Sequence, residues 1–298
     1  MTVADPSTRI AGRRPRGGRR LPLSWLGALP FLAYVSLFLL LPTAIVVIGA
    51  FVGPAGPSLD GFTAMAQGYI VTSFVNSMVV SGVSALAGAV AGALLAYAVV
   101  TGNPHGTLRR VVSSACGVLA QFGGVTLAFA FIATIGGAGL VTVWLREHGV
   151  DIYANGVWLY RLSGLTLVYT YFQVPLMVLV FLPALDGVRP QWREATESLG
   201  GGAWHYWRHV AGPLLLPAFL GSTLLLFANA FSAYATAAAL VNQGGIVVPL
   251  QISNALTSEV GLQHAEFAKA LALGMVVIVA AVMALYALLQ GRTARWLR

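Results

Sequence analysis

Two pairs of ionisable side chains in one polar stretch, residues 194–217, are the main groups in this chain that could do chemistry. Glu194 and Glu197 lie three residues apart, and His205 and His209 lie four apart. On a helix such pairs share a face, so the glutamates could form an acid pair and the histidines could share a metal ion. The sequence gives the histidines no evident third ligand, and charged side chains on an exposed helix usually face solvent or a partner. We therefore predict an interaction surface, with no metal bound.

An ATP-binding phosphate loop is missing from the sequence. The pattern GxxxxGK[ST] needs a lysine after a glycine, but the one lysine, Lys269, follows Ala268. No nucleophile elbow or Ser-His-Asp pattern stands out, and a triad with scattered members would leave no local pattern to find. We predict that the chain is not itself an enzyme, has no catalytic residues and binds no cofactor.

The composition is that of a protein that crosses a membrane several times. Of the 298 residues, 58% are hydrophobic and 9% are charged, whereas soluble domains have about 25% charged residues. Long apolar runs favour helices over the alternating strands of an outer-membrane barrel. The net charge of +8 comes mostly from arginines that flank these runs, which favours contact with membrane lipid over nucleic acid. The predicted fold class is therefore an all-α polytopic membrane protein.

Six apolar runs are long enough to be transmembrane helices. They lie at about residues 23–50, 72–100, 112–135, 162–185, 214–240 and 267–289. A short interfacial helix is expected at 140–148. Gly88 and Gly92 form a GxxxG pattern in the second run, which predicts close packing against a helix that the sequence does not identify.

Basic residues next to the runs predict the orientation, because they concentrate on the cytoplasmic side. With both termini in the cytoplasm, the inner segments carry 14 of the 17 basic residues. The external segments then carry Arg146 and Arg161, with Lys269 at the edge of the last run. This orientation places residues 194–217 in the cytoplasm.

Within the runs, neutral polar side chains are the candidates for a solute path. No Asp, Glu, Arg or His lies inside them, which argues against an ion-driven carrier but leaves a Na⁺ site built from carbonyls and hydroxyls open. Helix–helix hydrogen bonds are the alternative role for these polar groups. The fifth run directly follows the polar stretch, so we select its residues Asn229, Ser232 and Tyr234, and we add Asn76 from the second run.

The polar stretch and the residues just before it predict a short amphipathic helix that begins at Pro190. Four residues at i, i+3, i+4 and i+7 form one face: Trp192, Ala195, Thr196 and Leu199. Gly200–Gly202 should end this helix, because glycine accepts the left-handed conformation. A second short helix, Ala203–Val210, is expected to lead to the fifth run. A helix this short between two spans is typical of a docking element for a partner.

The spacing of this stretch resembles the EAA motif, EAAxxxG(x)9IxLP, of permease subunits in binding-protein-dependent ABC importers, the MetI-like family. The residues that match the letters of the motif are Glu194, Ala195, Gly200 and Pro213. Three residues depart from it: Thr196 replaces Ala, Val210 replaces Ile and Gly212 replaces Leu. Residues 74–77, at the start of the second run, are also similar to this family, and so is a core of five spans after one added span.

The resemblance implies a division of the chain. The parts are a basic cytoplasmic tail at 1–21, a first transmembrane helix and external loop at 22–71, a permease core at 72–290 that includes a coupling loop at 186–213, and a basic tail at 291–298. It further implies that Glu194, Ala195 and Gly200 contact separate ABC ATPase subunits, which bind ATP and Mg²⁺. The helical face adds Trp192 and Leu199 to this contact.

The family also implies a second permease, identical or homologous, an external solute-binding protein and a place in the bacterial plasma membrane. Residues 244–250 are similar to the branch for polyamines, iron, sulfate and phosphonates, which favours a small charged solute. A self-contained secondary carrier or channel is the alternative, and a membrane-embedded enzyme is a third hypothesis.

Overall fold

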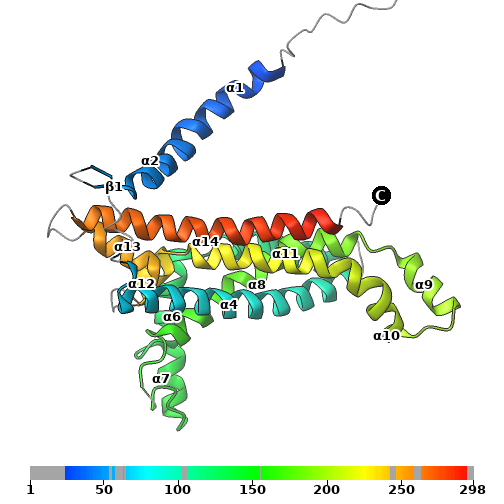
Figure 1. Cartoon of the computed structure of the whole chain (residues 1–298). Coiled ribbons are helices and arrows are strands. Elements are labelled where there is room, and N and C mark those ends of the chain that lie inside the picture. Colours follow the sequence, from blue (N-terminus) through cyan, green and yellow to red (C-terminus); the bar gives the residue numbers. More distant parts are fainter. Residues whose placement is uncertain are drawn as a thin grey trace, which may run out of the picture. The chain divides into compact units, whose positions relative to one another are not determined.

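The computed structural model describes residues 24–53, 56–57, 63, 65–102, 106–154, 156–241, 246–257 and 263–293 (Figure 1). They fall into two units, 1–45 and 46–298, and each is considered by itself. The predicted tail at 1–21 and most of the tail at 291–298 lie outside the described residues.

In the first unit, the described residues form a helical stretch that matches the first expected span. α1 (Ser24–Val35), the π-helical turn η1 (Ser36–Leu40) and α2 (Leu41–Gly49) follow one another without a break, and α2 continues past the boundary of the unit. The 21 residues from Leu29 to Gly49 are long and apolar enough to cross a membrane. This stretch confirms the first span.

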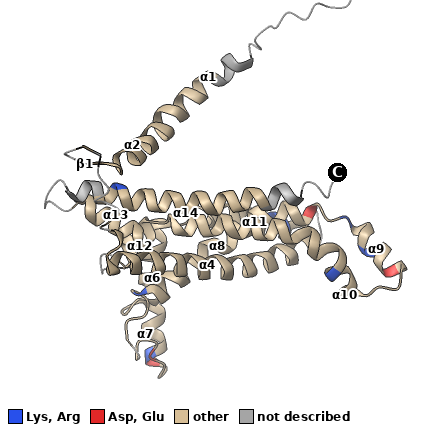
Figure 2. Cartoon of the chain, in the orientation of Figure 1, with Lys and Arg blue, Asp and Glu red and all other residues tan. Residues whose placement is uncertain are grey.

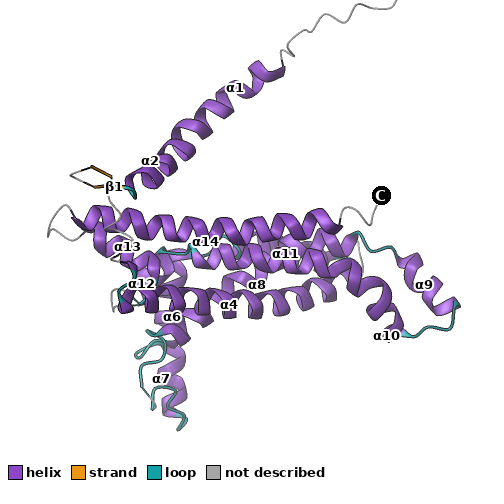
Figure 3. Ribbon diagram, in the orientation of Figure 1, coloured by secondary structure: helices purple, strands orange, loops and turns teal. Residues whose placement is uncertain are grey.

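The second unit supplies five more stretches that are long and apolar enough to cross a membrane, at 68–101, 124–147, 162–186, 203–231 and 267–288. Figure 3 shows that its described residues are mostly helical. The helices are α4 (Gly68–Thr101), α5 (Thr107–Leu119), α6 (Gly124–Ile135), α7 (Leu140–Glu147), α8 (Leu162–Asp186), α9 (Pro190–Ser198), α10 (Ala203–Tyr206), the π-helical turn η2 (Trp207–Ala211), α11 (Gly212–Phe231), α12 (Ala235–Leu240), α13 (Val248–Thr257) and α14 (Gln263–Thr293). A small hairpin pairs β1 (Val52–Gly53) with β2 (Gly56–Pro57). The number of spans is thus confirmed, and so is a short helix at 140–147, whereas its interfacial position stays a prediction.

The long helices α4, α8, α11 and α14 run side by side, with α9 and α10 at one end and α12 and α13 at the other (Figure 1). α4 and α11 contain no charged residue, and α8 has only Asp186, at its end (Figure 2). Such helices suit a hydrocarbon environment, where every backbone polar group is satisfied inside the helix. The charged groups of α9 and α10 lie beyond the apolar part of the bundle.

The GxxxG glycines of α4 pack directly against α8. A Cβ atom on Gly88 would lie 2.5 Å from the Cβ of Gln173, and one on Gly92 would lie 2.5 Å from the Cβ of Met177 and 2.6 Å from the carbonyl oxygen of Val174. Real Cβ atoms do not approach so closely, so only glycine fits at either position. The close packing predicted for this pair is confirmed, and the structure identifies α8 as the neighbour.

Two neighbouring polar side chains on α4 hydrogen-bond to the segment around α13. The backbone N–H of Val248 donates to Ser77 Oγ at 2.9 Å, and Asn76 Nδ2 donates to the carbonyl oxygen of Ile246 at 3.1 Å. In lipid these bonds replace hydrogen bonds that water cannot supply. Asn76, one of the predicted path residues, thus has a structural partner.

The third expected span, 112–135, is not one helix. It is divided into α5 and α6 by a turn in which Gly124 has a φ of +72°, and Gly123 is the extended residue before α6. The left-handed conformation is costly for other residues, so this glycine pair both permits and marks the break. The prediction of a continuous helix was wrong because it weighed apolarity over the two glycines.

The fifth expected span also differs at both ends. The helix predicted at 203–210 is not separate from the fifth span, because α10, η2 and α11 form one helical stretch from Ala203 to Phe231. Pro213 therefore lies inside this stretch, just after the π-helical turn η2, and it has no N–H to donate to the preceding turn. At the far end the helix breaks at 232–234 and resumes as α12, whereas the sequence predicted one helix from 214 to 240.

Candidate functional site

The first candidate site is the short helix α9 with the turn after it, and the structure confirms the boundaries predicted for this helix. α9 begins at Pro190, and Gly200 follows with a φ of +81°. The N–H of Gly201 donates to the carbonyl oxygen of Thr196 at 2.9 Å, and the N–H of Gly200 donates to that of Glu197 at 3.0 Å. These two bonds make a Schellman motif, which caps a helix through a left-handed residue.

The three glycines after α9 meet three different demands. Gly200 needs its positive φ, although no atom lies within 4 Å of the place where its Cβ would be. A Cβ on Gly201 would lie 2.8 Å from Thr196 Cγ2. Gly202 has extended backbone and precedes α10 as its N-cap, also with open space around it. A conformational requirement, and not crowding, therefore selects glycine at position 200.

The side chains predicted to contact an ATPase lie mostly on the surface. Glu194, Ala195 and Gly200 are exposed, Leu199 is 89% exposed, and Trp192 is half-buried. The rest of this chain therefore covers the predicted face only in part. Leu199 is thus free to contact another protein.

α9 is joined to the bundle through the helical stretch that begins with α10. The ring of Trp207 packs edge-on against Tyr97 of α4, with ring centroids 5.2 Å apart. Arg109 of α5 forms an ion pair at 2.5 Å with Asp186, the last residue of α8 before the connection to α9. Because both side chains are partly exposed, this pair contributes only about 0–1 kcal/mol to stability.

The histidine pair has no further metal ligand among the described residues. The rings of His205 and His209 stack with centroids 5.8 Å apart. No group of three or more His, Cys, Asp or Glu side chains that could hold a metal ion occurs in the described part of the chain.

The second candidate site is a cavity of about 280 Å³ at the opposite end of α11. It forms where the break between α5 and α6 meets the break between α11 and α12. The residues that line it are Ala120, Gly123, Gly124, Phe172, Asn229, Ser232, Ala233, Tyr234, Ala235 and Thr236. The structure thus brings together three of the predicted path residues, Asn229, Ser232 and Tyr234. Asn76 does not line this cavity.

Sequence reasoning missed Gly123, Gly124 and Thr236 as parts of this cavity. The glycine pair carried a signal, because two adjacent glycines inside an apolar run suggest a break. Thr236 carried none, because a threonine in an Ala-rich segment is an ordinary helix residue. Its position depends on the break at 232–234.

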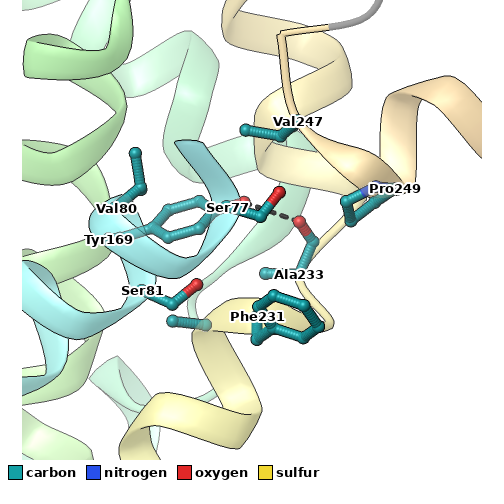
Figure 4. A pocket seen from close by; sticks show the side chains of 9 residues that line it. Ser77, Val80, Ser81, Tyr169, Phe231, Ala233, Val247 and Pro249 are labelled. Atoms are coloured by element: carbon teal, nitrogen blue, oxygen red, sulfur yellow. Dashed lines mark hydrogen bonds between the residues drawn. The ribbon is translucent and has the colours of Figure 1, made fainter. Parts of the chain in front are cut away.

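Hydrogen bonds from other helices hold that break. The hydroxyl of Tyr169 on α8 donates to the carbonyl oxygen of Ala233 at 2.6 Å (Figure 4). Tyr234 Oη and Ser253 Oγ of α13 lie 3.0 Å apart, within hydrogen-bonding distance. A small cavity of about 10 Å³ beside Tyr169, lined in part by Ser77 and Ser81 (Figure 4), is only large enough for one water molecule.

Comparison with known sequences places the chain in one family. The model of the family described as "binding-protein-dependent transport system inner membrane component" matches residues 152–297. A probable molybdenum ABC transporter permease protein of Haloferax volcanii is 30% identical over 230 residues, which are 76% of this chain and 79% of that protein. The sulfate transport system permease protein CysT of Escherichia coli is 27% identical over 174 residues, 58% of either chain. The ferric transport system permease protein FbpB of Actinobacillus pleuropneumoniae is 27% identical, and the match spans 68% of this chain but 29% of that protein.

Solved structures share the fold. A chain from a bacterial ABC transporter involved in the import of the acidic polysaccharide alginate superposes with a TM-score of 0.69 at 18% identity, covering 92% of this chain and 95% of that chain. A chain of the MetNI methionine ABC transporter in inward-facing conformations gives 0.54 at 14% identity, covering 74% and 94%. These likenesses confirm the expected MetI-like fold. With the family match and the Haloferax relative, they show that the chain belongs to the family of inner membrane components of binding-protein-dependent transport systems.

Proposed function

We propose that this chain is the permease subunit of an ATP-driven ABC importer in a bacterial plasma membrane. It forms the solute path together with a second permease, identical or homologous, and it is surrounded by membrane lipid. The observation that carries the proposal is the separation of two sites in one helix bundle. An exposed docking helix, α9, lies at one end of the bundle (Figure 1). The residues that line the polar cavity lie where α11 ends, at the other end.

In this proposal the α9 end faces the cytoplasm, as the distribution of basic residues suggests. A separate ABC ATPase subunit binds ATP and Mg²⁺ and receives Glu194, Ala195, Leu199 and Gly200, with Trp192 at the base of the contact. An external solute-binding protein delivers the solute to the cavity end. This chain itself hydrolyses nothing.

The helical stretch from Ala203 to Phe231 connects the two sites mechanically. It has 29 residues and therefore spans about 43 Å, at 1.5 Å per residue. Because the stretch is continuous, movement of α9 on the ATPase would be passed along it to the break at 232–234. The π-helical turn η2 lies inside this stretch, and such turns often occur at functional sites.

The relatives suggest the kind of solute. Their names refer to sulfate, ferric and molybdenum transport, and a further relative is the thiamine transport system permease protein ThiP of E. coli. We propose a small charged solute for this chain.

Glu194→Ala should weaken the contact with the ATPase. We expect ATPase activity that co-purifies with the full-length chain in mild detergent to fall roughly tenfold, because a lost hydrogen bond to a charged group is worth about 1.5–3 kcal/mol. The matched control is Glu147→Ala, another exposed glutamate, at the end of α7, which should retain the activity.

Two outcomes would contradict the proposed function. One is equal ATPase retention by the Glu194→Ala and wild-type chains. The other is solute uptake by the chain alone, in vesicles without ATP, which would support the self-contained carrier or channel.

A further inference from the structure

We propose that the cavity between the two helix breaks binds an anion, and that the solute of this permease is a small oxyanion. This inference rests on the proposed function and narrows its solute class. It follows from the hydrogen-bonding groups that face the cavity and from the charges that its lining lacks.

The first argument is the N-terminus of α6, which opens onto the cavity. α6 has 12 residues and begins at Gly124, and its N-cap, Gly123, has no side chain to cap it. The first N–H groups of a helix have no acceptor within the helix, and the helix dipole adds a partial positive charge there. An anion is the ligand that such a terminus favours.

The second argument is the hydroxyl of Thr236. This residue borders the cavity and is only 2% exposed, yet its hydroxyl forms no hydrogen bond with any described residue. Because the residue lines the cavity, this hydroxyl is free to hydrogen-bond to a molecule inside it. The oxygen of a bound anion would satisfy it.

The third argument is an asymmetry between helix ends. α5 and α11 end at the same cavity, and their carbonyl groups would favour a cation, but these are already occupied. On α11, Ala228 O accepts from the N–H of Ser232 at 3.2 Å, and Ala230 O accepts from that of Ala233 at 3.1 Å. On α5, Cys116 O accepts from the N–H of Ala120 at 2.9 Å. The carbonyl groups at these two helix ends are therefore mostly used, whereas the first N–H groups of α6 have no acceptor within their helix.

The lining also lacks what a cation would need. None of the ten residues that line the cavity is Asp or Glu, and hard cations and polyamines are bound chiefly by carboxylates. No Lys, Arg or His lines it either, so the anion would be held by neutral donors, including the amide of Asn229. Neutral donors bind an anion more weakly than charged ones do. Weak binding suits a solute path, since a transported solute must also leave. At about 280 Å³ the cavity has room for an oxyanion with part of its hydration shell.

The test is equilibrium binding of radiolabelled sulfate to the purified full-length chain in lipid nanodiscs. We expect saturable binding that unlabelled molybdate, phosphate or methylphosphonate displaces and that spermidine does not. The ranking of these competitors distinguishes an inorganic oxyanion from a phosphonate as the preferred solute.

Two variants locate the site. Asn229→Asp adds a negative charge at the cavity with little change in shape and should weaken sulfate binding about tenfold. Thr236→Val keeps the shape but removes the hydroxyl, and it should weaken binding severalfold. The matched control is Asn254→Asp, an exposed position on α13 that does not line the cavity and should bind sulfate like the wild type. Unchanged elution volume and melting temperature show that each variant is folded.

Three results would overturn the inference: no saturable binding of any of the four anions, displacement of sulfate by spermidine, or equal loss of affinity in Asn229→Asp and Asn254→Asp. ATPase co-purification is measured on the same wild-type sample. If the ATPase is present and anion binding is absent, the inference fails and the proposed function stands. If the ATPase is absent, the proposed function fails whatever the binding assay shows.

Discussion

Gly92→Leu is expected to prevent the helix bundle from folding. Even the first atom of the new side chain would lie 2.5 Å from the Cβ of Met177 and 2.6 Å from the carbonyl oxygen of Val174. The second of these is a backbone atom, so α4 and α8 would have to separate. Overpacking costs typically 1–3 kcal/mol in a soluble core, and here it would also remove the close contact on which helix association in lipid depends. The measurement is the yield of monodisperse protein in detergent and its melting temperature.

The matched control is Gly82→Leu on the same helix. No atom lies within 4 Å of the place where a Cβ on Gly82 would be, so this variant should give wild-type yield and melting temperature. If Gly92→Leu were as stable as Gly82→Leu, the packing of α4 on α8 described here would be wrong.

The sequence predicted those features of the fold that local patterns determine. Apolar runs locate the spans, because a bilayer requires about 20 apolar residues in a helix. Pro190 and Gly200 locate the ends of α9, because each has a conformation that suits a helix terminus. For the same reason, Gly123 and Gly124 could have revealed the break between α5 and α6.

The break at 232–234 could not have been predicted in this way. Its residues, Ser-Ala-Tyr, include neither glycine nor proline. The turn is held by Tyr169, which lies 64 residues away from Ala233 in the sequence. A bond of this kind depends on the packing of α8 beside α11, and a single sequence does not contain that information.

The candidate solute site was predicted in part for a similar reason. Asn229, Ser232 and Tyr234 line one cavity because they are close in the sequence, whereas Gly123 and Gly124 come from more than 100 residues away. Asn76 was chosen for its polarity alone, but polarity in a membrane helix serves hydrogen bonds between elements as readily as a solute path. Its bond to Ile246 is an example.

Gly200→Ser is expected to reduce ATP-driven uptake at least tenfold while leaving the fold intact. The φ of +81° at this position costs a residue with a Cβ about 1–2 kcal/mol. The strain would disturb the Schellman turn and with it the position of Leu199, which the proposed ATPase contact uses. Because open space surrounds the Cβ position, the helix bundle itself has no reason to change. Uptake of labelled sulfate into proteoliposomes with the ATPase subunits measures the effect, and melting temperature measures the fold.

Two further variants separate backbone conformation from the loss of glycine as such. Gly202→Ser places the same side chain two residues away, on extended backbone that serine adopts readily and at an N-cap that serine favours, so uptake should stay at the wild-type level. Gly200→Asn should restore much of the uptake lost in Gly200→Ser, because asparagine tolerates the left-handed conformation. Equal uptake by the Gly200→Ser and Gly202→Ser chains would mean that the coupling surface does not depend on this turn. Failure of asparagine to rescue would mean that the partner needs the bare backbone of Gly200 itself.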